Sequence, residues 1–259
     1  NIEKAADFDL SDEDEIREEL KYIDACQDAI DNLTINNLLI DTDDTEYHLG
    51  ILSPKYTKIL TNINNTEGLV FCYSQFRSVE GIGIFSKVLE SNGYARMYAS
   101  PNGDSISEDV DTELHIGDKV RYLNDPTIKT VWKTGTISTI DSEKGTLILL
   151  ESTSSIPITS VFKTYFALWT GTENDLQKKF ILNLFNNLEN KYGKRCTILM
   201  TTSSGAEGIS LMNIRQVHIM EPYWNNIRME QVIGRARRIK SHINLEKDQQ
   251  NVTIFKYNI

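Results

Sequence analysis

The sequence predicts an α/β fold, in which an open, mostly parallel sheet is flanked by helices and interrupted by a small antiparallel β-barrel. Short apolar runs of the kind that form buried parallel strands alternate with amphipathic helical stretches on both sides of residues 100–163. Within residues 100–163 the alternation stops, and short strand-like runs follow one another without helical periodicity. An acidic, helix-like segment over residues 1–50 precedes both parts.

The acidity of the chain is concentrated in this first segment, which holds 16 Asp and Glu against 3 Lys and Arg. The whole chain has a formal net charge of −10, and since residues 1–50 contribute −13, residues 51–259 carry +3. Residues 10–34 place apolar side chains at roughly helical spacing and predict a helix. The acidic run from Asp12 to Glu15 lacks the apolar strand that a Mg²⁺-binding carboxylate needs before it, so we interpret it as a solvated helix face.

The α/β part is predicted over residues 51–99 and 164–259. Its expected strands lie at residues 68–74, 165–171, 196–202, 217–222 and 251–259, and its expected helices at residues 78–94, 173–193 and 226–238. Gly93 supplies a C-terminal stop for the first of these helices.

The insert over residues 100–163 begins with a polar, turn-rich stretch at 100–113 that we interpret as a linker. Four or five short strands are then expected at 116–123, 129–141, 145–152 and 156–162, with Gly117, Gly135 and Gly145 at turns. The pattern resembles small SH3-like barrels of the Tudor or KOW kind. Arg121, Tyr122, Trp132 and Lys133 suit contacts to nucleic acid, whereas the balance of six basic and five acidic residues over 115–163 suits protein docking or spacing equally well.

Other sequence features narrow the classes of function. The three cysteines form no C-x-x-C pair and the four histidines show no ligand spacing, so we expect neither a disulfide framework nor a metal site, in a reducing intracellular setting. The sequence contains no run of 18 apolar residues, so we expect no membrane span. The charged first residues do not resemble a secretory signal. The chain also lacks an initiator Met, so we expect it to be a fragment of a longer protein.

The segment QVIGRARR, residues 231–238, carries the strongest chemical signal. On a helix Gln231, Gly234, Arg235 and Arg238 share one face, and both guanidinium groups can reach one anion. Their forked N–H donors suit phosphate oxygens, and Gly234 lets a ligand approach closely. The alternative from these residues alone is a solvated basic helix at the edge of a domain.

This segment resembles motif VI of superfamily 2 helicases and translocases, Q-x-x-G-R-x-x-R, and other motifs appear in the family's order. MTTSSGAEGISL, residues 200–211, resembles motif V, with Gly208, Ile209, Ser210 and Leu211 in its core. VFCYSQF, residues 70–76, resembles motif IV, and LWTGT, residues 168–172, resembles the strand-end motif that follows it. The whole is similar to Swi/Snf-like helicases of large DNA viruses, of the giant virus and poxvirus type, over roughly residues 52–98 and 164–258.

The resemblance implies the second RecA-like domain of such a motor and a role for each motif. Arg235 and Arg238 would be arginine fingers on the γ-phosphate, with Gln231 orienting nearby groups. Contacts to the nucleotide are implied for Glu207, Gly208, Ser210 and Gly234, where Ser210 replaces the Asp or Asn of many relatives. Contacts to a nucleic-acid backbone are implied for Ser74, Gln75, Thr170, Gly171, Thr201, Thr202 and Ser203.

The chain contains no Walker A pattern G-x-x-x-x-G-K-[ST] and no Walker B sequence. The resemblance therefore implies that ATP and Mg²⁺ are bound mainly by a first RecA-like domain missing from this chain, which alone should not hydrolyse ATP.

The function that these observations predict is the C-terminal motor domain of an ATP-dependent helicase or translocase in viral transcription or genome handling. Its partners would be DNA or RNA, the missing first domain, and other proteins through the β insert, in an infected cell's cytoplasm or in a virion. The alternative is a non-catalytic adaptor that kept the fold, and the pair Arg235 and Arg238 favours the motor.

Overall fold

A computed structural model describes residues 10–42, 47–77, 81–102, 105–123, 132–170, 173–203, 205, 208–221 and 225–258. Its centre is a six-stranded sheet in the order β13-β12-β1-β11-β10-β2, in which every neighbouring pair is parallel. The strands are β1 (Leu69–Tyr73), β2 (Ala95–Arg96), β10 (Tyr165–Trp169), β11 (Ile198–Thr201), β12 (Ile214–Ile219) and β13 (Thr253–Lys256). This sheet confirms the predicted RecA-like α/β class.

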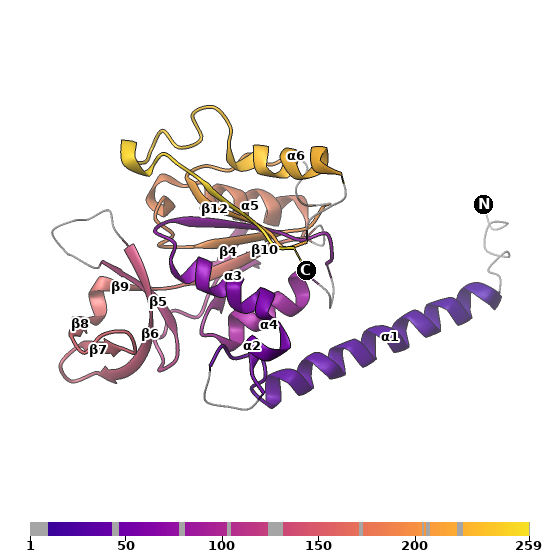
Figure 1. The fold of residues 1–259 in the computed structure, drawn as a ribbon, viewed down its shortest axis with the longest axis horizontal. Coiled ribbons are helices and arrows are strands. Elements are labelled where there is room, and N and C mark those ends of the chain that lie inside the picture. The colour runs from indigo at the N-terminus through magenta and orange to yellow at the C-terminus, as the bar shows by residue number, and fades with distance from the viewer. Residues whose placement is uncertain are drawn as a thin grey trace.

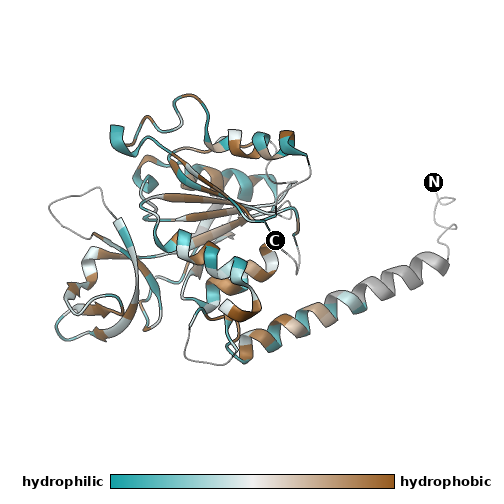
Figure 2. Cartoon of the chain, in the orientation of Figure 1, coloured by the Kyte–Doolittle hydropathy of each residue, from teal (hydrophilic) through white to brown (hydrophobic). Residues whose placement is uncertain are grey.

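Helices cover both faces of the sheet, as Figure 1 shows. On one face lie α2 (Leu49–Leu52), α3 (Pro54–Asn64) and α4 (Ile82–Ser91), and on the other α5 (Asp175–Phe185) and α6 (Asn226–Ala236). Strand β1 is buried along its whole length because Leu69 and Phe71 face α5 and α6, whereas Val70 and Cys72 face α3 and α4. Figure 2 shows the result, apolar strands inside and polar helix surfaces outside.

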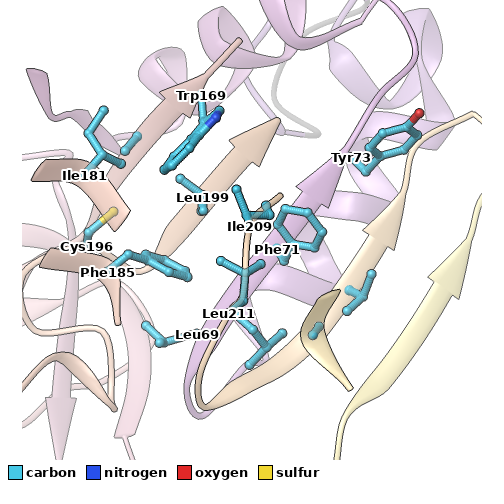
Figure 3. Close-up of a cluster of buried hydrophobic side chains, with 14 of the residues drawn as sticks. Leu69, Phe71, Tyr73, Trp169, Ile181, Phe185, Cys196, Leu199, Ile209 and Leu211 are labelled. Atoms are coloured by element: carbon cyan, nitrogen blue, oxygen red, sulfur yellow. The ribbon is translucent and has the colours of Figure 1, made fainter. Parts of the chain in front are cut away.

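The core beneath α5 also takes in a loop between strands. Figure 3 shows Ile209 and Leu211 beside Phe71 and Leu199 of the central strands, with Phe185 of α5 closing the cluster. Ile209 and Leu211 are both buried although neither lies in a helix or strand. The burial of these two side chains fixes the loop that carries the predicted nucleotide-contacting residues Gly208 and Ser210.

One predicted helix in the α/β part needs correction. The helix expected over 173–193 begins with a capping box of Asn174 and Gln177 but ends at Phe185, and a 3₁₀ turn, Leu188–Asn190, follows. The side chain of Asn186, the residue after α5, bonds the backbone of Ser210 and Met212.

The stretch expected to be a linker, residues 100–113, is largely a β-hairpin. Strands β3 (Tyr98–Asn102) and β4 (Ser105–Asp109) pair antiparallel and pack against α5. The side-chain amide of Gln177 on α5 donates to the carbonyl oxygen of Ala99 at 2.8 Å, which ties the hairpin to the helix. The Gly-Asp pair at 103 and 104, between two strand-forming runs, is a hairpin signal that the sequence interpretation gave to a loop.

The rest of the insert forms a second sheet of five antiparallel strands in the order β8-β7-β6-β5-β9. They are β5 (Lys119–Leu123), β6 (Trp132–Asp141), β7 (Thr146–Leu149), β8 (Ser155–Pro157) and β9 (Val161–Lys163), with a 3₁₀ turn, Ile158–Ser160, between the last two. Gly117 and Gly145 lie in turns as predicted, but Gly135 lies inside β6, where its missing side chain makes room for Leu149. Closure of this sheet into a barrel, and a domain of its own over 100–163, stay predictions.

The five-stranded sheet packs against the α/β part through several contacts, of which two bury large side chains. The fully buried guanidinium of Arg121 on β5 lies 3.4 Å from the carbonyl oxygen of Thr66, and burial lowers the pKa of Arg121 to about 10. On the other side Trp132 packs with Tyr192 and Leu245. These two contacts hold the insert in one orientation.

The acidic N-terminal helix is present as α1 (Leu10–Ile35) and projects away from the body in Figure 1. Its C-terminal end meets α4, where Ile30 is buried.

A buried histidine in β12 gives the fold a pH dependence. The ring of His218 stacks with Phe255 and Tyr257, and its Nδ1 lies 2.7 Å from the Tyr257 hydroxyl. Burial lowers the pKa of His218 to about 3, below the value of about 6.5 expected in an unfolded chain. Between these values the unfolded chain binds a proton that the folded chain does not, so acid favours unfolding.

We expect the free energy of unfolding to fall by about 2 kcal/mol between pH 7 and pH 5 through His218 alone. Urea unfolding of the protein and of His218→Gln at both pH values measures this, since the variant should lose that part of the fall. The same pH dependence in both proteins would contradict the assignment.

Candidate functional site

The predicted site residues follow the carboxyl ends of the central strands. Because these strands are parallel, Ser74 after β1, Thr170 after β10, Thr202 after β11 and Glu221 after β12 lie along one edge of the sheet. The parallel sheet thus brings the predicted residues of motifs IV and V together. Ligands of open α/β sheets bind outside this edge.

Most of the hydroxyl groups at this edge point into the protein. Ser74, Thr170, Thr201 and Thr202 are buried. The Thr201 hydroxyl donates to the carbonyl oxygen of Trp169 at 2.8 Å, and the Thr202 hydroxyl donates to that of Thr170 at 3.1 Å. Ser74, Thr201 and Thr202 connect neighbouring strand ends in this way, and the Thr170 hydroxyl lies 3.3 Å from the Glu173 carboxylate. The nucleic-acid contacts expected of these four residues stay predictions.

Two of the predicted nucleic-acid contacts are half-exposed at the same edge, namely Gln75 and Ser203. Gly171 and Glu207 lie outside the described residues.

Glu221 is a site residue that the sequence interpretation missed. One of its carboxylate oxygens accepts from the Ser74 hydroxyl at 2.6 Å and from the Gln75 backbone N–H at 3.3 Å, and the other lies 3.4 Å from the Lys55 ammonium. The carbonyl oxygen of Glu221 also accepts from the Gln75 side chain at 3.4 Å. Its side chain is 11% exposed, so these bonds are largely shielded from water. The signal in the sequence was a carboxylate directly after the apolar run of β12.

Gly208 and Ser210 lie on the loop fixed by Ile209 and Leu211. Gly208 adopts a left-handed conformation with φ of +77°, which favours glycine. Asn186, just after α5, holds the loop from outside, because its amide donates to the Ser210 carbonyl oxygen at 2.8 Å and accepts from the Met212 N–H at 2.9 Å. The early end of α5 thus fixes the backbone on either side of Leu211.

Gln231, Gly234 and Arg235 lie on α6 as predicted, but α6 ends at Ala236, so Arg238 lies beyond it. Arg238 is positioned by a side-chain contact instead of helix geometry, since its Nη1 donates to the Ser210 hydroxyl. The Leu211 N–H donates to the Arg235 carbonyl oxygen at 3.2 Å. The predicted motifs V and VI are therefore in direct contact.

The surroundings of Gly234 and of Arg238 leave room for an anion. Apart from the adjoining backbone of α6, no described atom lies within 4 Å of where a side chain on Gly234 would begin. Arg237 and Arg238 line a cavity of about 470 Å³ together with His242 and Gln250. Exposed guanidinium groups beside an open glycine fit a phosphate group, because their N–H donors are charged and forked.

In the described part of the chain, no three His, Cys, Asp or Glu side chains are grouped so that they could hold a metal ion. None of the helices described there combines the length and the apolar character needed to cross a membrane.

Residues 133–240 match the family described as helicase conserved C-terminal domain. A protein of Acanthamoeba polyphaga mimivirus named as an ATP-dependent RNA helicase is 29% identical over 221 residues, 85% of this chain and 28% of the relative. The termination factor NPH-I homolog of African swine fever virus is 33% identical over 205 residues, 79% of this chain and 26% of the relative.

A third relative, nucleoside triphosphatase I of Melanoplus sanguinipes entomopoxvirus, is 25% identical over 159 residues, 59% of this chain and 24% of that protein. Among solved structures, the C-terminal part of the Fun30 ATPase domain aligns with 92% of this chain and 48% of its own, at 14% identity and a TM-score of 0.41. The chain spans about a quarter of the length of the curated relatives it matches.

Glu221 provides a test of how the edge is held together. Glu221→Ala should lower the free energy of unfolding by about 1–3 kcal/mol, because the buried Ser74 hydroxyl loses a charged partner. Glu221→Gln keeps an acceptor oxygen and should cost about half as much or less. Urea unfolding measures both, with the exposed Glu189→Ala as control. A loss in Glu221→Ala no larger than in this control would contradict the bracing role.

Proposed function

We propose that this chain works as the second RecA-like domain of an ATP-dependent helicase or translocase. The match of residues 133–240 to the helicase conserved C-terminal domain and the similarity to viral helicases support the proposal. The observation that supports this most directly is the bond from Arg238 to Ser210, which joins motif VI to motif V. An adaptor that only kept the fold would need neither arginine at this place.

Arg235 and Arg238 act in this proposal as arginine fingers. Their guanidinium groups neutralise the negative charge that develops on the γ-phosphate, an effect that contributes on the order of 10³ or more in rate. The hydroxyl of Ser210 positions the Arg238 guanidinium, and Gln231, exposed on α6, orients neighbouring groups. The remaining N–H donors of a guanidinium diverge in a fixed fork, so an arginine bound to Ser210 can also bind phosphate.

The triphosphate itself is held mainly by a first RecA-like domain outside this chain. The 259 residues contain no Walker A pattern, and the described part shows no group of acidic side chains for Mg²⁺. When bound there, ATP would supply the free energy released by hydrolysis of its γ-phosphate. On its own the chain should not hydrolyse ATP.

Nucleic acid binds along the carboxyl edge of the sheet in this proposal. Gln75 and Ser203, the half-exposed members of the predicted set, contact the sugar-phosphate backbone. The buried residues Ser74, Thr170, Thr201 and Thr202 hold the strand ends from which Gln75 and Ser203 project.

The names of the relatives, an RNA helicase, a termination factor and a nucleoside triphosphatase, support a setting in viral transcription or genome handling, in a host cytoplasm or a virion. Docking of other proteins on the insert stays a prediction.

The finger assignment is tested in the longer protein that includes the first domain. Arg235→Ala and Arg238→Ala should each reduce nucleic-acid-stimulated ATP hydrolysis by about 10³-fold while ATP binding is largely kept. Lys240→Ala, which removes an exposed cation close in sequence, is the matched control and should stay active. Steady-state hydrolysis and binding of a fluorescent ATP analogue measure the two effects. Unchanged turnover in either finger variant would refute the assignment, and the absence of GK[ST] and DE-x-[DH] upstream would refute the motor.

A further inference from the structure

An aromatic side chain with a stacked cation stands at the outer strand of the sheet. Tyr98, the first residue of β3, is 47% exposed, and the guanidinium carbon of Arg96 lies 4.6 Å from its ring centroid. Arg96 belongs to β2, the edge strand that pairs with β10. The Nε atom of Arg96 is buried and has no hydrogen-bond partner among the described residues. The guanidinium places a positive charge beside the ring.

Both side chains line a cavity of about 290 Å³. Met97, Leu168 and Ile181 form its apolar part, and Glu173 and Gln177 contribute its polar part. Leu168 lies two residues before Thr170, whose N–H donates to Glu173 at 2.8 Å. The cavity thus directly adjoins the end of β10, where the proposed nucleic-acid edge begins.

The polar groups around this cavity are already used inside the protein. The Gln177 side chain donates to the Ala99 carbonyl oxygen at 2.8 Å and accepts from the Asn174 N–H at 3.0 Å. The Glu173 carboxylate accepts from the Thr170 N–H and lies 3.3 Å from the Thr170 hydroxyl. A ligand in this cavity meets an aromatic ring and a cation. Few polar atoms remain that could tell one planar ligand from another by its pattern of hydrogen-bond donors and acceptors.

We propose that Tyr98 and Arg96 form a stacking platform for one unpaired nucleobase of the strand whose backbone the carboxyl edge holds. The inference rests on the proposed nucleic-acid binding and adds a base contact to it. A planar base can stack on the exposed ring of Tyr98, and the negatively charged phosphates of its strand are attracted to Arg96. The cavity has room for about one base. Because the polar wall is internally bonded, the platform accepts any base.

The test uses this 259-residue chain with fluorescein-labelled single strands of about 20 nucleotides at low salt, as DNA and as RNA. Tyr98→Ala should raise the Kd by roughly 5- to 100-fold, and Tyr98→Phe should stay within about twofold because the ring remains. Tyr47→Ala, which removes an aromatic side chain that is 59% exposed and distant in sequence, is the control and should change little. Strands of different base composition should bind with similar Kd.

An abasic strand of the same length separates stacking from backbone contact. Tyr98→Ala should not weaken its binding, whereas Gln75→Ala and Ser203→Ala should weaken normal and abasic strands alike. If Tyr98→Ala binds the normal strand as the wild type does, or weakens both strands equally, the stacking platform is refuted and the proposed backbone contacts stand. If the wild-type chain binds neither strand, the proposed nucleic-acid function fails and the platform with it.

Discussion

The constraint on which this structure depends is the burial of a parallel sheet on both faces. Strand β1 has no exposed residue, so polar side chains that serve a ligand can be placed only where the strands end. Parallel strands end at one edge, and Ser74, Thr170, Thr202 and Glu221 therefore come together although they are far apart in sequence. The edge holds them in place through internal hydrogen bonds, which is why most of their hydroxyl groups face the protein.

Two side chains connect the loops of this edge. Asn186 binds the backbone on both sides of Leu211 and so ties α5 to the loop that carries Ser210. Glu221 binds Ser74 and Gln75, which ties the end of β12 to the loop after β1. The same β12 continues toward α6 and its arginines.

The insert contributes rigidity, and its hairpin contributes surface. The buried Arg121 on one side and Trp132 on the other hold the five-stranded sheet against the parallel sheet. A fully buried guanidinium with two unpartnered nitrogen atoms in the described structure costs free energy, so it is tolerated where shape and orientation matter. The β3–β4 hairpin instead extends the carboxyl edge outward and presents Tyr98 beside it.

The sequence alone predicted five of the six parallel strands and the helices α4, α5 and α6 in order, because buried parallel strands and amphipathic helices have different apolar periods. It also singled out Gln231, Gly234, Arg235 and Arg238 through a spaced motif. It missed α3 and the edge strand β2, and it missed the hairpin that begins at Tyr98, the end of α5 at Phe185, and Glu221. The last three depend on partners distant in the chain: Ala99 meets Gln177, Asn186 meets Met212, and Glu221 meets Ser74. The tertiary structure alone also decided which hydroxyl groups brace the edge and which reach solvent. Burial and hydrogen-bond partners follow from packing, and the local periodicity of the sequence does not encode them.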